Sequence, residues 1–351
     1  TMRGSYEETQ DVSIGPCCRR GSSETAVFHY IKHSQPRLHM MLSKERFFCG
    51  VCFACGPRRE TDVSSPLALP VHSLDLRNKV TVREFDSFNF LMIVCSYSCK
   101  SLDLRLGFDL CAEEQDFICK RKKVVAAALK NILHLDEDLQ EDEVPVVAVV
   151  TAAGGVRSMT AMFGSLLALQ ELGVLDCVSY ISGLSATTWT MAKLYEDANW
   201  SQKDLSGPVN DIREHVIKSK LHCFSLDLMK YYVKELCERK QEGHKVSFTD
   251  FWGLFIDCML HHQESTHKLS HQQLAVNQGQ NPLPIYVSLN VKDDFSTLDF
   301  KEWVEFTPYE VGFLKYGAFV RSEDFGSEFF MGHLMKKIPE SHICFLEGDL
   351  L

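Results

Sequence analysis

The pattern of apolar and polar residues is clearest between residues 144 and 195. Residues 144–150 (VPVVAVV) form an uninterrupted apolar run between breakers, which predicts a buried parallel strand. Residues 158–172 then carry apolar side chains at helical spacing, residues 176–182 (DCVSYIS) are β-rich, and TTWTMAKLY opens a further helix. Residues 281–292 (NPLPIYVSLNVK) predict another strong strand. This alternation predicts a parallel α/β sheet with a right-handed crossover.

The flanking segments divide the chain further. Residues 1–65 mix Ser, Arg, Pro, Gly and Cys without a sustained period, so we expect an irregular segment there. Residues 66–100 contain short β-rich runs separated by polar breaks. Residues 113–143 predict a helix that leads into the acidic run 136–143, which we expect to be solvated because like charges repel. Residues 206–278 are predicted to be mostly helical.

Charge and hydropathy narrow the class of protein. The 47 acidic residues outnumber the 37 basic ones, and a formal net charge of −10 argues against a nucleic-acid partner. No apolar run approaches the roughly 20 residues of a membrane-spanning helix. The N-terminus shows no apolar signal region, so we expect a cytoplasmic protein. The basic run at 120–123 (KRKK) is interpreted either as a solvated helix face, which we favour, or as a contact with anionic lipid.

The 14 cysteines are scattered and are expected to be reduced thiols. Cys49, Cys52 and Cys55 have metal-like spacing, and a zinc site there would need a fourth ligand such as Cys17, Cys18 or His39. No second pair with this spacing exists, so the favoured interpretation is three thiols in a loosely ordered segment, and no metal site is assigned.

Ser185 stands between the second strand-like run and the next helix, in the sequence Gly183-Leu184-Ser185-Ala186-Thr187. A serine on a sharp strand-to-helix turn is the geometry of a nucleophile elbow, usually written G-x-S-x-G. The free N–H groups at the helix N-terminus would favour developing negative charge on its oxygen. Thr187 replaces the second glycine, and a small N-cap serine is the alternative interpretation.

Gly154 and Gly155 follow the first strand-like run, about one βαβ unit before Ser185. Acyl transfer requires backbone N–H donors aimed at the tetrahedral oxyanion, and paired glycines let the backbone approach a substrate closely. Both loops would lie at the carboxyl ends of neighbouring strands. A dinucleotide-binding loop is disfavoured because the required glycine spacing is absent and Asp176 precedes the second strand. Arg157 would suit a phosphate near the scissile ester, and an ordinary surface arginine is the alternative.

Blocks spread from residue 101 to residue 346 resemble the cytosolic (group IV) phospholipases A2, most closely the delta-type branch. They include SLDLRLGFDLCAEEQDFICKRKKVVAAALK, GGVRSMTAM, LDCVSYISGLS, KEWVEFTPYEVGFLKYGAF and FGSEFFMG. The resemblance implies a patatin-like α/β catalytic domain with a mostly parallel central sheet and a Ser–Asp dyad. It implies Ser185 as nucleophile, Gly154 and Gly155 as oxyanion hole, and Arg157 as phosphate contact. The implied reaction hydrolyses acyl esters of membrane glycerophospholipids through an acyl-serine intermediate, with peripheral membrane association.

The sequence departs from the family pattern in three respects. Ala186-Thr187 stand where the family carries Gly-Ser, and residues 151–153 (TAA) replace a glycine-richer loop, which we expect to crowd the elbow. The family's catalytic Asp lies in a later Asp-Gly or Asp-Ser block that we do not find, and Asp349 lacks that context, so residues 101–351 are expected to be a C-terminally incomplete catalytic domain with impaired activity. Residues 66–100 are expected to be at most the remnant of a calcium-binding C2 domain, because clustered aspartates are few.

Two other functions remain open at this stage. The chain could be a catalytically silent remnant of the same fold that binds lipid or a partner. A Ser–His–Asp esterase is the other alternative, although none of the candidate bases, His261, His262, His333 and His342, follows a recognisable late strand.

Overall fold

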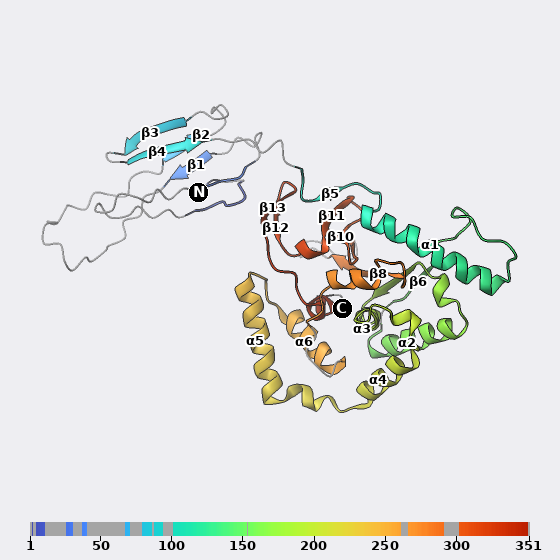
Figure 1. Cartoon of the computed structure of the whole chain (residues 1–351). Coiled ribbons are helices and arrows are strands. Elements are labelled where there is room, and N and C mark those ends of the chain that lie inside the picture. Colours follow the sequence, from blue (N-terminus) through green and yellow to red (C-terminus); the bar gives the residue numbers. More distant parts are fainter. Residues whose placement is uncertain are drawn as a thin grey trace. The chain divides into compact units, whose positions relative to one another are not determined.

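The computed structural model describes residues 2, 5–10, 26–30, 37–40, 67–70, 79–85, 88–93, 101–152, 154–260, 266–290 and 302–349. The chain divides into two units, Thr1–Ser101 and Leu102–Leu351 (Figure 1).

The described part of the first unit is built from two antiparallel strand pairs. Strand β1 (Arg37–Met40) pairs with β2 (Leu67–Pro70), and β3 (Lys79–Phe85) pairs with β4 (Phe88–Ile93). Three of these strands lie in the segment for which the sequence predicts β structure. Strand β1 lies within residues 1–65, where we expected only irregular chain, so that expectation missed one element.

A sheet of seven strands forms the centre of the second unit, in the order β5-β11-β10-β9-β8-β7-β6. The strands are β5 (Arg105–Leu106), β6 (Ala148–Val150), β7 (Tyr180–Leu184), β8 (Leu283–Asn290), β9 (Glu302–Phe306), β10 (Glu310–Phe313) and β11 (Ala318–Arg321). Strands β6, β7 and β8 are parallel neighbours, and each pair from β8 to β5 is antiparallel. The α/β class and the parallel strands β6, β7 and β8 agree with the prediction from the sequence. The antiparallel pairs from β8 to β5 make the whole sheet a mixed one.

Helices pack against this sheet in groups. They are α1 (Ala112–Leu133), α2 (Val156–Glu171), α3 (Thr187–Leu194), α4 (Ser206–Ile217), α5 (Leu226–Glu242), α6 (Phe248–Leu260) and α7 (Ile343–Asp349). Helices α2, α3 and α4 lie together, while α5 and α6 form a neighbouring group (Figure 1). Short 3-10 turns connect several of them, and β12 (Glu328–Phe330) pairs with β13 (His333–Lys336) as a separate hairpin.

The core forms where the apolar stripe of α2 meets β7 and α3. Met159, Phe163 and Leu166 recur three to four residues apart along α2 and are almost fully buried, as are Ile181 on β7 and Met191 on α3. Each such side chain contributes roughly 1.5–3 kcal/mol when it is removed from water. This packing fixes α2 and α3 against the sheet, and with them the two loops that precede these helices.

Strand β6 differs from its expected environment. The apolar run predicted a buried strand, yet β6 is the edge strand of the described sheet and Val150 is 77% exposed. Within the described sheet, β6 pairs only with its parallel neighbour β7. An uninterrupted apolar run therefore does not require a neighbouring strand on both sides.

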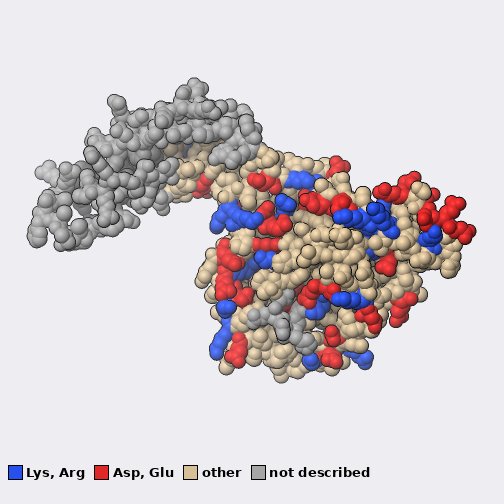
Figure 2. Space-filling model, in the orientation of Figure 1, with Lys and Arg blue, Asp and Glu red and all other residues tan. Residues whose placement is uncertain are grey.

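The basic run 120–123 is not a continuous solvated face. Arg121 is fully buried, and its guanidinium donates to five backbone carbonyls: Val178 at 2.9 Å, Gly279 and Gln280 at 3.0 Å, Asp176 at 3.3 Å and Leu175 at 3.4 Å. Lys120 pairs with Asp116, and Lys122 donates to the Glu141 carbonyl. On the face shown in Figure 2, basic and acidic side chains are interspersed, so the described surface there presents no broad basic patch for nucleic acid.

Candidate active site

Ser185 occupies a strained turn between β7 and α3. The strand ends at Leu184 and the helix begins at Thr187, so only Ser185 and Ala186 make the connection. Ser185 has φ +57°, a left-handed conformation that a residue with a Cβ adopts rarely and usually at functional sites. The residue is half-buried, and its carbonyl accepts the Thr188 N–H at 2.8 Å to start the helix. This is the strand–turn–helix arrangement that the sequence predicted.

Small residues beside Ser185 are required by packing. A Cβ placed on Gly183 would lie 2.5 Å from the Met191 Sδ atom and 3.2 Å from the Thr187 Oγ1 atom, so helix α3 lies directly against the strand backbone. Ala186 is completely buried. The turn is therefore tight because α3 packs onto the end of its own strand.

Thr187 stabilises the turn through its hydroxyl. Its Oγ1 accepts the Leu184 N–H at 3.0 Å and donates to the Leu184 carbonyl at 2.9 Å, and the residue is buried. Thr187 was expected to crowd the elbow, but its hydroxyl instead makes two hydrogen bonds to the end of the strand.

The glycine loop leaves the sheet at the same edge. Val150 is the register partner of Ser182, and Thr151, the next residue, donates to the Ser182 carbonyl through both its N–H (2.8 Å) and its hydroxyl (2.9 Å). Gly154 and Gly155 follow with φ +116° and +66°, conformations that favour glycine. Gly155 caps α2 by accepting the Ser158 N–H at 2.9 Å. The two loops therefore follow the carboxyl ends of adjacent parallel strands.

The first turns of α2 and α3 lie close to each other and carry no acidic residue. The Thr190 hydroxyl on α3 donates to the Met159 carbonyl on α2 at 3.1 Å, which joins the helices near their N-termini. Without Asp or Glu in either first turn, the positive ends of both helix dipoles remain uncompensated. Arg157 lies in the first turn of α2 and is exposed. The arrangement suits stabilisation of an anion formed at Ser185.

Tyr180, at the opposite end of β7 from Ser185, has a shifted pKa, as does its hydrogen-bond partner Glu114 on α1. Burial raises the pKa of Tyr180 and of Glu114, whose carboxylate accepts the Tyr180 hydroxyl at 2.8 Å. Of the four candidate histidine bases, His261 and His262 lie outside the described residues. His333 lies on β13, 3.8 Å from the Asp103 carboxylate, and His342 precedes α7.

Side chains of the kinds that can bind a metal ion gather at a place that the sequence did not indicate, between the turn after α4 and helix α6. Cys17, Cys18, Cys49, Cys52 and Cys55 lie outside the described residues, so their interpretation stays a prediction. Among the residues that are described, His222, Cys223 and Cys258 bring their ligand atoms within 4.8 Å of one another. Their separation along the chain matches no metal-binding motif, so only the folded structure brings them together.

None of the described helices combines the length and the apolar character needed to cross a bilayer; even α1, with 22 residues, is rich in charge.

Comparison with known proteins gives two family matches. The model of the lysophospholipase catalytic domain matches residues 147–348, and that of the C2 domain of cytosolic phospholipases A2 matches residues 1–85. The second match covers the stretch that we expected to be irregular, so C2-type sequence is recognisable and is not confined to residues 66–100.

Individual relatives agree with these matches. Human cytosolic phospholipases A2 epsilon and delta are each 49% identical to this chain, over 98% and 99% of it, so neither branch is singled out. A structure of human GIVD cytosolic phospholipase A2 in complex with methyl gamma-linolenyl fluorophosphonate and terbium chloride matches with a TM-score of 0.81 and 46% identity, covering 99% of this chain and 46% of that one. The chain spans 39% and 41% of the length of the two curated relatives. With the lysophospholipase catalytic-domain match over more than half of its residues, the C2 match of cytosolic phospholipases A2 and these relatives, the chain belongs to the cytosolic phospholipase A2 family.

Proposed function

We propose that this chain carries the acyl-serine chemistry of a phospholipase A2, acting on acyl esters of glycerophospholipids. The observation that carries the proposal is the left-handed Ser185 at the junction of β7 and α3, beside two helix N-termini without acidic residues. Attack of the Ser185 hydroxyl oxygen on the ester carbonyl forms a tetrahedral oxyanion, and collapse of that intermediate releases the lysophospholipid alcohol. Water then hydrolyses the acyl-serine and releases the fatty acid.

In this mechanism, the N–H groups of Gly154 and Gly155 stabilise the oxyanion, and the exposed Arg157 guanidinium contacts the lipid phosphate. The fluorophosphonate bound to the related human enzyme supports the assignment, since such reagents phosphonylate activated serines. We assign no residue of this chain as the base of the dyad.

Labelling with a fluorophosphonate tests the serine directly. The native chain and the Ser182→Ala variant, which changes a serine of the same strand, should be labelled, while Ser185→Ala should not. Equal labelling of Ser185→Ala would contradict the proposal. Hydrolysis of phospholipid vesicles, followed in parallel, distinguishes slow turnover from a silent lipid-binding remnant, which would bind vesicles without releasing fatty acid.

We also propose peripheral membrane association of a cytoplasmic protein, with residues 1–85 contributing calcium-dependent binding. A second contact is supported by exposed apolar side chains between α4 and α6, where Leu221 and Leu226 are each 80% exposed. The double change Leu221→Ser and Leu226→Ser should weaken sedimentation with anionic vesicles in the presence of calcium. Leu172→Ser, at a 70% exposed leucine after α2, serves as the matched control and should not.

A further inference from the structure

One histidine and two cysteines meet between a short turn and helix α6. His222 and Cys223 are consecutive residues of the 3-10 segment Lys220–Phe224, and Cys258 lies near the end of α6. The imidazole nitrogen and the two sulfur atoms all lie within 4.8 Å of one another. Cys223 is fully buried, Cys258 is half-buried and His222 is exposed, so the group spans from the interior to the surface.

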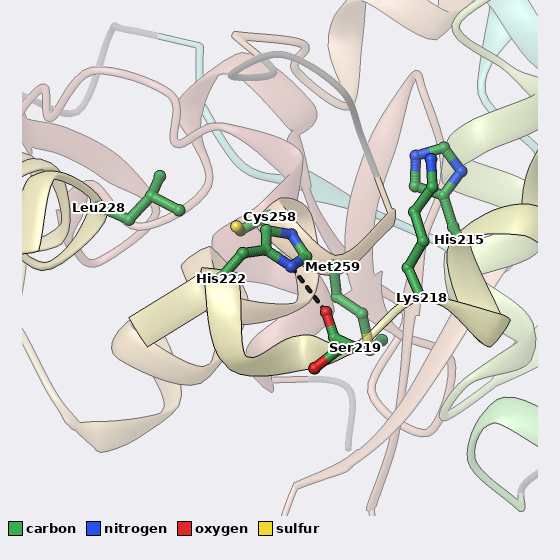
Figure 3. Close-up of a pocket in the computed structure, with 7 residues that line it drawn as sticks. All are labelled: His215, Lys218, Ser219, His222, Leu228, Cys258 and Met259. Atoms are coloured by element: carbon green, nitrogen blue, oxygen red, sulfur yellow. Dashed lines mark hydrogen bonds between the residues drawn. The ribbon is translucent and has the colours of Figure 1, made fainter. Parts of the chain in front are cut away.

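The imidazole of His222 is held in the orientation that metal binding needs. Its Nδ1 lies 2.8 Å from the Ser219 carbonyl oxygen (Figure 3). A carbonyl only accepts, so Nδ1 carries the proton and Nε2 keeps its lone pair. A backbone carbonyl on the outer nitrogen is the usual partner of a metal-ligating histidine.

The spacing of the donor atoms agrees with zinc coordination. The His222 Nε2 atom lies 3.5 Å from the Cys223 Sγ atom. Tetrahedral zinc bonds of about 2.0–2.1 Å to nitrogen and about 2.3 Å to sulfur place these two atoms about 3.6 Å apart. Small rotations of the Cys258 side chain would complete the set.

The surroundings leave room for a fourth ligand. A cavity of about 490 Å³ adjoins the group and is lined by His215, Lys218, Ser219, His222, Leu228, Cys258 and Met259 (Figure 3). No carboxylate lines this cavity in the described part of the chain, and nitrogen and sulfur donors select thiophilic ions over calcium and magnesium.

We propose that His222, Cys223 and Cys258 bind one zinc ion, with the fourth position open to this cavity. The ion would join the turn after α4 to helix α6, through ligands, Cys223 and Cys258, that are more than thirty residues apart in the sequence. The site is separate from Ser185 and does not depend on the proposed hydrolysis.

The test uses the full chain with Cys49, Cys52 and Cys55 changed to serine, which removes the three cysteines on which the other candidate zinc site depends. We expect one equivalent of zinc by elemental analysis, and a thiolate-to-metal charge-transfer band when Co²⁺ replaces it. His222→Gln and Cys258→Ser should each lose this equivalent. Cys237→Ser, which removes an exposed free cysteine on α5, should retain it.

Because His222 is exposed, His222→Gln should fold normally, and a thermal melt without metal checks this. Unchanged zinc content in both His222→Gln and Cys258→Ser would overturn the proposal. So would a Co²⁺ complex without the thiolate band, or a disulfide between Cys223 and Cys258 found by peptide mapping of the freshly purified chain.

Discussion

The Thr187 hydroxyl makes two hydrogen bonds to the backbone of Leu184, one as acceptor at 3.0 Å and one as donor at 2.9 Å. This contact closes the turn that carries Ser185. Thr187→Val keeps the shape and removes both bonds at a half-buried strand end, so it should destabilise the chain by about 1–3 kcal/mol and weaken fluorophosphonate labelling. Thr187→Ser retains the hydroxyl and should behave like the native chain. Equal urea midpoints for the two variants would contradict this role.

The two glycines before α2 should differ in their tolerance of alanine. A Cβ on Gly154 would lie 2.4 Å from the Ser158 Oγ atom at φ +116°, while a Cβ on Gly155 would meet nothing within 4 Å. Gly155→Ala should therefore lose about 1–3 kcal/mol from its backbone conformation alone, because φ +66° with ψ −154° is a region nearly restricted to glycine. Gly154→Ala should lose more, and adding Ser158→Ala should restore only the steric part. The measurement is the free energy of unfolding of the three variants and the native chain.

Arg121 should be among the residues most sensitive to substitution. Arg121→Met would leave five carbonyl oxygens without their donor, and we expect a loss of at least about 3 kcal/mol. Arg121→Lys should recover only part, because one ammonium cannot reproduce the planar fork of donors. Lys123→Met, on the exposed face of α1, should stay within about 0.5 kcal/mol of the native chain in the same urea titration.

The stability of the second unit should fall in mild acid. Burial lowers the pKa of His342, helped by the Lys268 ammonium, and burial together with His271 lowers the pKa of His267. Both histidines are therefore neutral in the folded chain, whereas the unfolded chain takes up protons at a pKa of about 6.5. Stability is present above about pH 6.5 and is lost as the pH falls toward the lowered values.

Urea midpoints at about pH 7.5 and about pH 5.5 measure this loss. The double change His267→Gln and His342→Gln should reduce the difference, leaving the share of His244, whose pKa burial also lowers, while His134→Gln, at an exposed histidine after α1, should leave it intact. An unchanged difference in the double variant would rule out these two groups as its source.

The local elements around Ser185 could be predicted from the sequence because each follows from neighbouring residues. The order β6, α2, β7, α3 and the tight turn at Ser185 were expected and are present. The pairing of distant strands could not be predicted. The apolar run of β6 does not indicate that this strand lies at the edge of the described sheet. The same limit applies to His222 and Cys258, which meet only after α6 folds back.

Helix α1 illustrates a second limit. Apolar residues continue along the helix to Ile132 and Leu133, yet these residues are 36% and 58% exposed. The buried stripe is Phe117, Arg121 and Val125. An arginine in the middle of a buried stripe conflicts with hydropathy, and only the carbonyl groups from two distant loops make it stable there.

The hydrogen bonds of Arg121 also decide how far the second unit can be shortened at its N-terminal end. The catalytic-domain match begins at residue 147, after α1, but the carbonyls that Arg121 satisfies precede β7 and β8 inside the matched region. A shortened chain starting at 147 would lose the guanidinium that donates to these carbonyls and would expose them to water. A chain designed to contain this unit alone should therefore begin near residue 102, so that it keeps helix α1 and Arg121.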